Sequence, residues 1–159
     1  MAARWGIALS GFDRLDRALK SMAADVSNFR APLEQSVRKV MIPSIVQNFE
    51  VGGRPPWEPL SDETIARKGD DRPLIETGQG MRSAGARARW VIGRDRAEYH
   101  GESFPERSWP MQLHQHADDF NVNFPARPFA VVQPEDMSRM QGVFAAWLDR
   151  DVIPRYRRG

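Results

Sequence analysis

Cysteine is absent from the 159 residues of this chain. The absence excludes a disulfide framework, a thiolate zinc site and a cysteine nucleophile. Long apolar runs are absent as well, since no stretch approaches the roughly 18 apolar residues of a membrane-spanning helix. Charged residues also interrupt residues 1–20, where a secretion signal needs an apolar core. These absences predict a soluble protein made in a cytoplasm, with no membrane among its partners.

The charge balance is close to neutral. Lysine and arginine number 23 against 21 aspartates and glutamates, which gives a formal net charge of +2. Such a weak excess leaves nucleic-acid binding open without indicating it. Apolar residues make up 41% of the chain and charged residues 28%, the balance of a globular protein rather than a disordered one. The length suits one hydrophobic core, so we expect a single domain over residues 1–159.

Apolar residues recur at helical spacing in the first third of the chain. The steps are three and four over residues 12–26, and four over residues 29–49. Both patterns predict amphipathic helices, and Pro43 should bend the second helix or loosen one of its turns. A short alternating segment at residues 5–9 predicts a first strand.

Residues 51–80 are predicted to form a stiff, protruding arm. The arm opens with a Gly-Gly pair at 52–53, which can end the preceding helix and reverse the chain because glycine adopts positive φ. A Pro-Pro pair follows, which restricts the backbone further. Trp57 and Leu60 are expected to pin the arm, and a short helical turn is expected over 61–68.

The C-terminal half predicts strands and one more helix. Apolar segments at 90–93 and 97–100 flank a turn and predict a β-hairpin, and residues 127–132 predict a short strand. Pro-Glu-Asp then begins a last helix, which should stop before the proline that opens a basic tail at residues 154–159. The sequence therefore predicts an α+β fold. An N-terminal helical hairpin and a C-terminal helix would pack on a small, mainly antiparallel β-sheet, with long extended arms and loops.

Two histidines at alternate positions, His114 and His116, would face the same side of a strand, a spacing compatible with metal ligands. Asp118 and Asp119 follow them. A polar turn explains the same residues, and such short motifs are weak, so we expect no metal and no cofactor. Serine, histidine and aspartate occur without a G-x-S-x-G elbow or a similar context, and we expect no enzyme.

Arginines surround the predicted hairpin. They could follow DNA phosphates, in which case binding would weaken steeply with salt. A solvated or ion-paired strand face explains them equally simply, and we favour this second interpretation because basic patches are a non-specific signal. The candidate DNA-facing residues are Arg82, Arg87, Arg89, Arg94 and Arg96.

Several short motifs follow one another in a defined order. A Gly-Gly arm carries Trp-Glu-Pro-Leu, and Leu-Ile-Glu-Thr-Gly, His-Gln and Pro-Ala-Arg-Pro-Phe come after it. They lie at residues 52–53, 57–60, 74–78, 114–115 and 125–129. In this order and spacing the chain resembles the virion morphogenesis, or tail completion, proteins of P2-like and Mu-like phages.

The resemblance implies a structural role without a reaction. Copies would form a ring at the head-proximal end of the phage tail and take part in joining the tail to the filled head. The implied partners are other copies of the chain, tail terminator or tail-tube proteins and head–tail connector proteins, with DNA passing through the channel as an open alternative. The implied location is the neck or tail of the virion, and the host cytoplasm during assembly. The arm and the loop at 101–125 would reach neighbouring subunits.

The residues expected at the subunit interface come from these motifs. They are Trp57, Leu60, Thr77, Gly78, His114, Arg127 and Phe129. For Trp57 and Phe129, burial in the core of the chain itself is an equally good interpretation. Two other classes of function stay open: a DNA-contacting protein of the neck channel that uses the Arg-rich hairpin, and a metal-dependent hydrolase built around His114 and His116.

Overall fold

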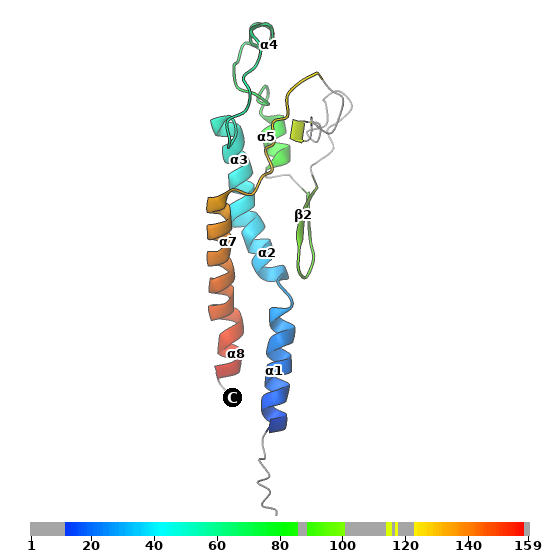
Figure 1. The fold of residues 1–159 in the computed structure, drawn as a ribbon, viewed down its shortest axis with the longest axis vertical. Helices are drawn as coiled ribbons and strands as arrows, with labels where there is room; N and C mark the ends of the chain where they lie inside the picture. The colour runs from blue at the N-terminus through cyan, green and yellow to red at the C-terminus, as the bar shows by residue number, and fades with distance from the viewer. Residues whose placement is uncertain (1–11, 86–88, 101–113, 116, 118–122, 158–159) are drawn as a thin grey trace, which may run out of the picture.

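The computed structural model describes residues 12–85, 89–100, 114, 115, 117 and 123–157 of the chain. The molecule is elongated, with helices along its long axis and a two-stranded sheet at one side (Figure 1). The predicted α+β class is confirmed. The strand predicted at residues 5–9 and the arginine at position 87 lie outside the described residues. Within them, no helix is long and apolar enough to cross a membrane.

The N-terminal half forms a column of helices. These are α1 (Phe12–Val26), α2 (Arg30–Ser36), the π-helical segment η1 (Val37–Met41) and α3 (Ile42–Val51). In Figure 1 they follow one another along the long axis, so the two N-terminal helices do not fold back on each other as the predicted hairpin required. The apolar face of the second helix is instead covered by the C-terminal helix, which packs against α2 and η1.

The C-terminal helix runs antiparallel to this column. It consists of α7 (Pro134–Trp147), the π-helical segment η3 (Leu148–Val152) and α8 (Ile153–Arg157). The ring of Phe29, in the link between α1 and α2, packs at 5.6 Å from Phe144 and 6.1 Å from Trp147, measured between centroids. At the far end Arg155 and Tyr156 bind the carboxylate of Asp25 on α1 at 3.0 and 2.9 Å. The antiparallel helices of this fold are therefore the N-terminal column and the C-terminal helix, which are far apart in the sequence.

Pro43 in the N-terminal column and Pro154 in the C-terminal helix are accommodated in the same way. The N–H of Ile42, just before Pro43, bonds to the carbonyl of Val37, five residues back, and the N–H of Ile153 bonds to Leu148 in the same way. A proline ring in an α-helix clashes with the carbonyl four residues earlier, and a wider turn moves that carbonyl away. The loosened turn expected near Pro43 is confirmed. The predicted end of the last helix before Pro154 is wrong, because the π-helical turn lets it continue.

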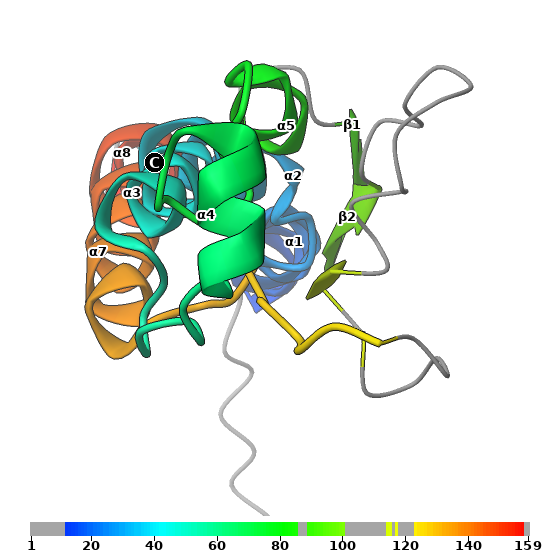
Figure 2. The same ribbon diagram turned by 90° about the horizontal axis from the view of Figure 1, so that it is seen from above.

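The remaining elements are short and lie above and beside the helices. They are α4 (Asp62–Lys68), α5 (Gln79–Ala84), β1 (Arg89–Ile92) and β2 (Ala97–His100). The strands pair antiparallel with Trp90 opposite Tyr99, which confirms the predicted hairpin. Figure 2 shows the hairpin standing to one side of α1 and α2, with α4 crossing over the end of the helical column.

The hydrophobic core lies where α3, the segment after it and the hairpin meet. Phe49 is 1% exposed and its ring centroid lies 5.7 Å from that of Trp57 and 5.4 Å from that of Phe129. Ile45 and Ile75 complete the buried cluster with Ala84. Tyr99 packs an edge against Phe129, so the hairpin is attached to the core through its inner face.

Residues 127–132 do not form the predicted strand. Among the described residues their backbone groups pair with no strand: the Arg127 N–H bonds to the carbonyl of His114, and the groups of Phe129 and Ala130 bond to side chains. The Gln115 carbonyl oxygen Oε1 accepts the N–H groups of Phe129 and Ala130, both at 2.9 Å. The Asn48 amide donates to the Phe129 carbonyl at 2.6 Å. The pattern of apolar residues was strand-like, but long-range side-chain partners replaced the ladder.

Candidate assembly interface

The arm is rooted by a buried tryptophan. Trp57 is 8% exposed, packs edge-on against Phe49, and its indole Nε1 donates to the carbonyl of Pro128 at 2.9 Å. Gly53, with φ of 96°, leaves room for this ring, because a Cβ there would lie 2.4 Å from the indole Cδ1. The predicted positive φ values of the Gly-Gly pair are thus observed, and one of the two glycines also makes the space for the anchor.

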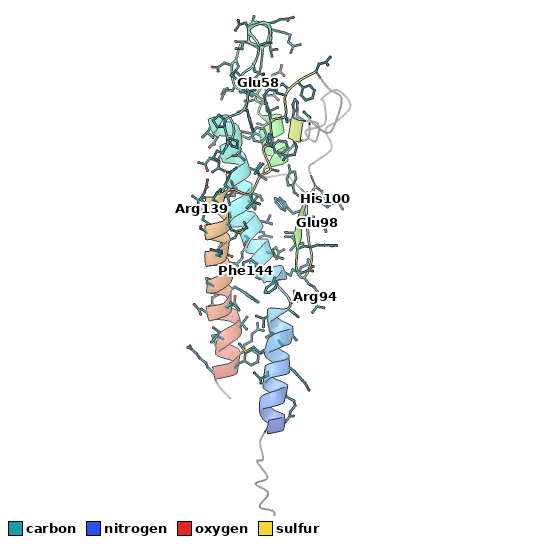
Figure 3. All side chains as sticks on the ribbon, in the orientation of Figure 1. Glu58, Arg94, Glu98, His100, Arg139 and Phe144 are labelled. Carbon is teal, nitrogen blue, oxygen red and sulfur yellow. The ribbon has the colours of Figure 1, made fainter. Side chains whose placement is uncertain are left out.

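Arg127 ties the next residues of the arm to the same core. It is 5% exposed, and its guanidinium donates to the carbonyl of Glu58 from Nε at 3.1 Å and from Nη2 at 3.0 Å. The same Nη2 also reaches the carbonyl of Pro59 at 3.3 Å. A planar guanidinium holds two adjacent carbonyls in a fixed direction. Figure 3 shows Glu58 below the tip of the molecule, where the chain leaves the body.

A polar junction centred on Arg54 fixes the entry to the arm. Its guanidinium donates to Asn48 at 2.7 Å, to the hydroxyl of Ser44 at 2.6 Å and to the carboxylate of Glu135 at 2.7 Å. The Gln133 side chain in turn donates to the Arg54 carbonyl at 2.6 Å. α3, the arm and the start of α7 therefore meet at one side chain.

The buried acid of this junction is Asp136, which is fully buried in the first turn of α7. It accepts hydrogen bonds from the hydroxyl of Ser44 and from the N–H of Gln133. Sequence analysis missed Arg54 and the residues around it. The sequence does show Arg54 between a Gly-Gly pair and a Pro-Pro pair. Its hydrogen-bond partners, however, lie up to 81 residues away and leave no local sequence pattern.

Of the two histidines of the motif, His114 is described, and it lies next to Arg127 and Phe124. The pKa of His114 is lowered by burial and by the positive charge of Arg127. Its ring packs on Phe124 with the centroids 4.6 Å apart, and its carbonyl accepts the Arg127 N–H at 2.7 Å. Over the part of the chain that the structure describes, no three His, Asp or Glu side chains come together as metal ligands. His116, Asp118 and Asp119 lie outside that part.

The tip of the arm is α4, and none of its residues is buried. Ser61 caps its first turn by accepting the N–H of Thr64 at 3.3 Å, and Gly69 ends it with a φ of 73°. This confirms the helical turn predicted over 61–68. Beyond it Arg72 forms a bidentate ion pair with Asp70, and Lys68 donates to the Arg72 carbonyl. The hydrogen bonds of the Arg72 side chain hold the pKa of Asp70 well below its usual range.

The arm ends at Thr77 and Gly78, directly before α5. Thr77 is exposed and its hydroxyl accepts the N–H of Gln79 at 3.4 Å, while Gly78 has a φ of 70°. Arg82, in α5, donates to the Thr77 carbonyl at 3.3 Å, so this arginine contacts the arm. Leu60, which precedes α4 in the arm, is half-buried.

The outer face of the hairpin carries charges of both signs. Arg89, Glu98 and His100 share this face, and the Glu98 carboxylate lies 3.1 Å from Arg96 and 3.5 Å from His100. Figure 3 shows Arg94, Glu98 and His100 on the side of the hairpin away from the helices. An acid in the middle of the face partly cancels the basic patch, which favours the ion-paired interpretation of these arginines.

Of the seven candidate interface residues, His114 is half-buried beside Arg127, and the other six divide into two groups. Trp57, Arg127 and Phe129 lie in the interior of the chain and hold the arm in place. Leu60, Thr77 and Gly78 lie at or near the surface, on either side of the projecting α4. The arrangement therefore holds α4 and the turns on either side of it in a fixed position, away from the helical column.

Comparison with known proteins gives the family. The chain is 31% identical over 136 residues to the Mu-like prophage FluMu G protein 2 of Haemophilus influenzae, a match that covers 82% of this chain and 86% of the relative. The chain belongs to the Mu-like phage morphogenesis family. No family profile matches the sequence. No solved structure matches it either. The Mu-like family assigns the chain a structural or morphogenetic role in a phage, as the resemblance predicted.

Proposed function

We propose that this Mu-like phage protein completes the tail and takes part in head–tail joining, as a ring of identical subunits at the head-proximal end of the tail. It would act by binding and not by catalysis. Its partners would be its own copies, the tail terminator or tail tube, and the head–tail connector. The observation that carries the proposal is the projecting arm, whose helix α4 has no buried residue in the isolated chain.

A helix of seven residues is too short to persist alone in water. α4 is instead held by its cap at Ser61, by the turn at Gly69 and by the Trp57 and Arg127 anchors below it. A surface ordered in advance loses little conformational entropy when a partner docks on it. Such an arrangement suits a subunit that must dock repeatedly in one geometry, as in a ring.

The first experiment deletes the gene from the phage and examines the lysate by electron microscopy. We expect filled heads separated from tails, or tails of aberrant length. Normal infectious particles would overturn the proposal.

A second experiment restores the deleted gene with single variants of exposed arginines. Arg67→Glu changes the surface of α4, and Arg139→Glu makes the same change on the exposed side of α7, where Figure 3 labels the residue. Both variants should keep the melting temperature of the parent chain, because neither side chain is buried. Arg67→Glu should lower the yield of infectious particles at least tenfold and Arg139→Glu should not. Equal yields would remove the arm from the interface.

A further inference from the structure

The β-hairpin has an edge that no described residue pairs with. The sheet contains only β1 and β2 among the described residues. Gly93 N–H bonds to the Arg96 carbonyl at 2.8 Å, and hydrogen-bonded pairs alternate along an antiparallel ladder. Val91 and Glu98 are therefore a hydrogen-bonded pair, and the N–H and C=O groups of Trp90 and Ile92 point away from β2. A row of backbone donors and acceptors at the outer edge of β1 is thus without a strand partner among the described residues.

Two features make β1 the edge that accepts a strand. A two-stranded sheet is marginally stable, and a third strand adds support. Charged side chains protect a sheet edge against pairing, and the outward side chains of β2 are Glu98 and His100, which form an ion-paired group with Arg96. β1 has one charged outward side chain, Arg89, and its other outward side chain, Val91, is apolar and 40% exposed.

The chain contains a segment whose pattern fits this edge. Over residues 5–9, Trp5, Ile7 and Leu9 alternate with Gly6 and Ala8, which is the pattern of a strand with one apolar face. The apolar face matches the inner face of the hairpin, where Trp90 and Ile92 are more buried than their neighbours.

Residues 5–9 cannot lie along a strand of the hairpin in their own chain, because Leu9 is too close to the start of α1. α1 begins at Phe12 and has 15 residues, so its far end is roughly 22 Å away at 1.5 Å per residue. The hairpin turn lies beyond that end, where the Phe29 N–H bonds to the Arg94 carbonyl, and the strands extend farther from α1 (Figure 1). Leu9 can lie at most about 10 Å from Phe12 in extended chain.

We propose that residues 5–9 of one copy add to the outer edge of β1 in a second copy as a third strand. The proposal deepens the proposed ring and rests on it, because it names the contact between subunits. Trp5, Ile7 and Leu9 would continue the apolar inner face, and Gly6 and Ala8 would lie on the outer face beside Val91. Main-chain hydrogen bonds supply affinity in this kind of strand addition, and the alternating side chains supply register.

Because the chain has no cysteine, engineered pairs report the contact directly. One chain carries Ala8→Cys, and a second chain of different tag length carries Val91→Cys. After mixing and mild oxidation, we expect a disulfide-linked heterodimer on a non-reducing gel, and a ladder when both substitutions are in one chain. Ala2→Cys replaces Ala8→Cys in the matched control, which should give less than a tenth of the heterodimer.

The same samples are sized by light scattering, which separates failure of the strand from failure of the ring. Oligomers that form without the 8–91 cross-link overturn the strand addition and leave the ring intact. A cross-linked monomer in the doubly substituted chain overturns the exchange between copies. Preferred linkage of Ala8→Cys to Glu98→Cys overturns the choice of edge. The absence of any oligomer overturns this contact together with the ring.

Discussion

Gly53 is the residue on which the geometry of the arm depends most closely. An added Cβ would lie 2.4 Å from the Trp57 indole, whereas at Gly52, which also has positive φ, it would meet nothing within 4 Å. Gly52→Ala should therefore lose only the cost of a left-handed alanine, about 1–2 kcal/mol. Gly53→Ala should lose about 1–3 kcal/mol more, because the indole must move. Urea unfolding of the two variants measures the difference, and equal losses would contradict this account of Trp57.

His114 makes stability depend on pH. Burial and then the charge of Arg127 lower its pKa in the folded chain, so the unfolded chain binds a proton first as the pH falls. The contribution of His114 is thus complete above the unfolded pKa of about 6.5 and declines as the pH falls below it, towards the folded pKa. His114→Gln should have a flatter urea midpoint between pH 7.5 and about 5.5. A parent curve that is flat in this range would contradict the assignment.

Among the elements, the extended segment at 127–132 depends on one side chain in place of a strand. Gln115→Ala removes the acceptor of the Phe129 and Ala130 N–H groups. An unsatisfied buried donor costs about 1–3 kcal/mol, so the free energy of unfolding should fall by at least that amount. Gln115→Glu keeps an acceptor oxygen for both N–H groups but puts a second acceptor in place of the donor that faces the Ala130 carbonyl at 3.4 Å. It should lose less than Gln115→Ala, because the charged oxygen accepts the two N–H groups more strongly than the amide does. Calorimetric or urea unfolding compares the two. A larger loss for Gln115→Glu would contradict the role of the acceptor.

The elements also show what a sequence can predict here. Apolar periodicity located the long helices and the hairpin but not the short helix α5, because a side chain that faces the core repeats with the period of its element only over several turns. It failed at Pro154, where a proline signals an end only if no wider turn relieves the clash. It also failed for the strand predicted at 127–132. There the side chains of Gln115 and Asn48 bond to the backbone of Phe129, where a strand would bond to a neighbouring strand. Part of the candidate interface was predicted from the sequence, because Trp57, Arg127 and Phe129 lie in recognisable motifs. Arg54 and Asp136 were not predicted, because their hydrogen-bond partners are distant in the sequence.

At the scale of the whole molecule, two elements project from opposite ends. α4 stands at one end without a buried residue, and α1 extends at the other, where Arg155 and Tyr156 hold it through Asp25 (Figure 1). Leu19, on α1, is 56% exposed. Segments with few buried contacts open locally at a small cost in free energy, so both should exchange their amide hydrogens faster than α3, whose Ile45 and Phe49 are in the core.

Assembly should change this pattern at both ends of the molecule. In hydrogen-exchange mass spectrometry of the isolated chain, peptides from α1 and α4 should exchange at least tenfold faster than the peptide from α3. In purified phage tails α4 should become protected, because the proposed subunit contacts cover the arm, and the α3 peptide serves as the internal control because it is already protected in the isolated chain. α1 should slow as well if residues 5–9 are engaged by a neighbouring copy, since anchoring its first turn opposes fraying from that end. Protection of α1 without α4 would place the interface at the wrong end, and unchanged exchange at both would show that neither projection is an assembly contact.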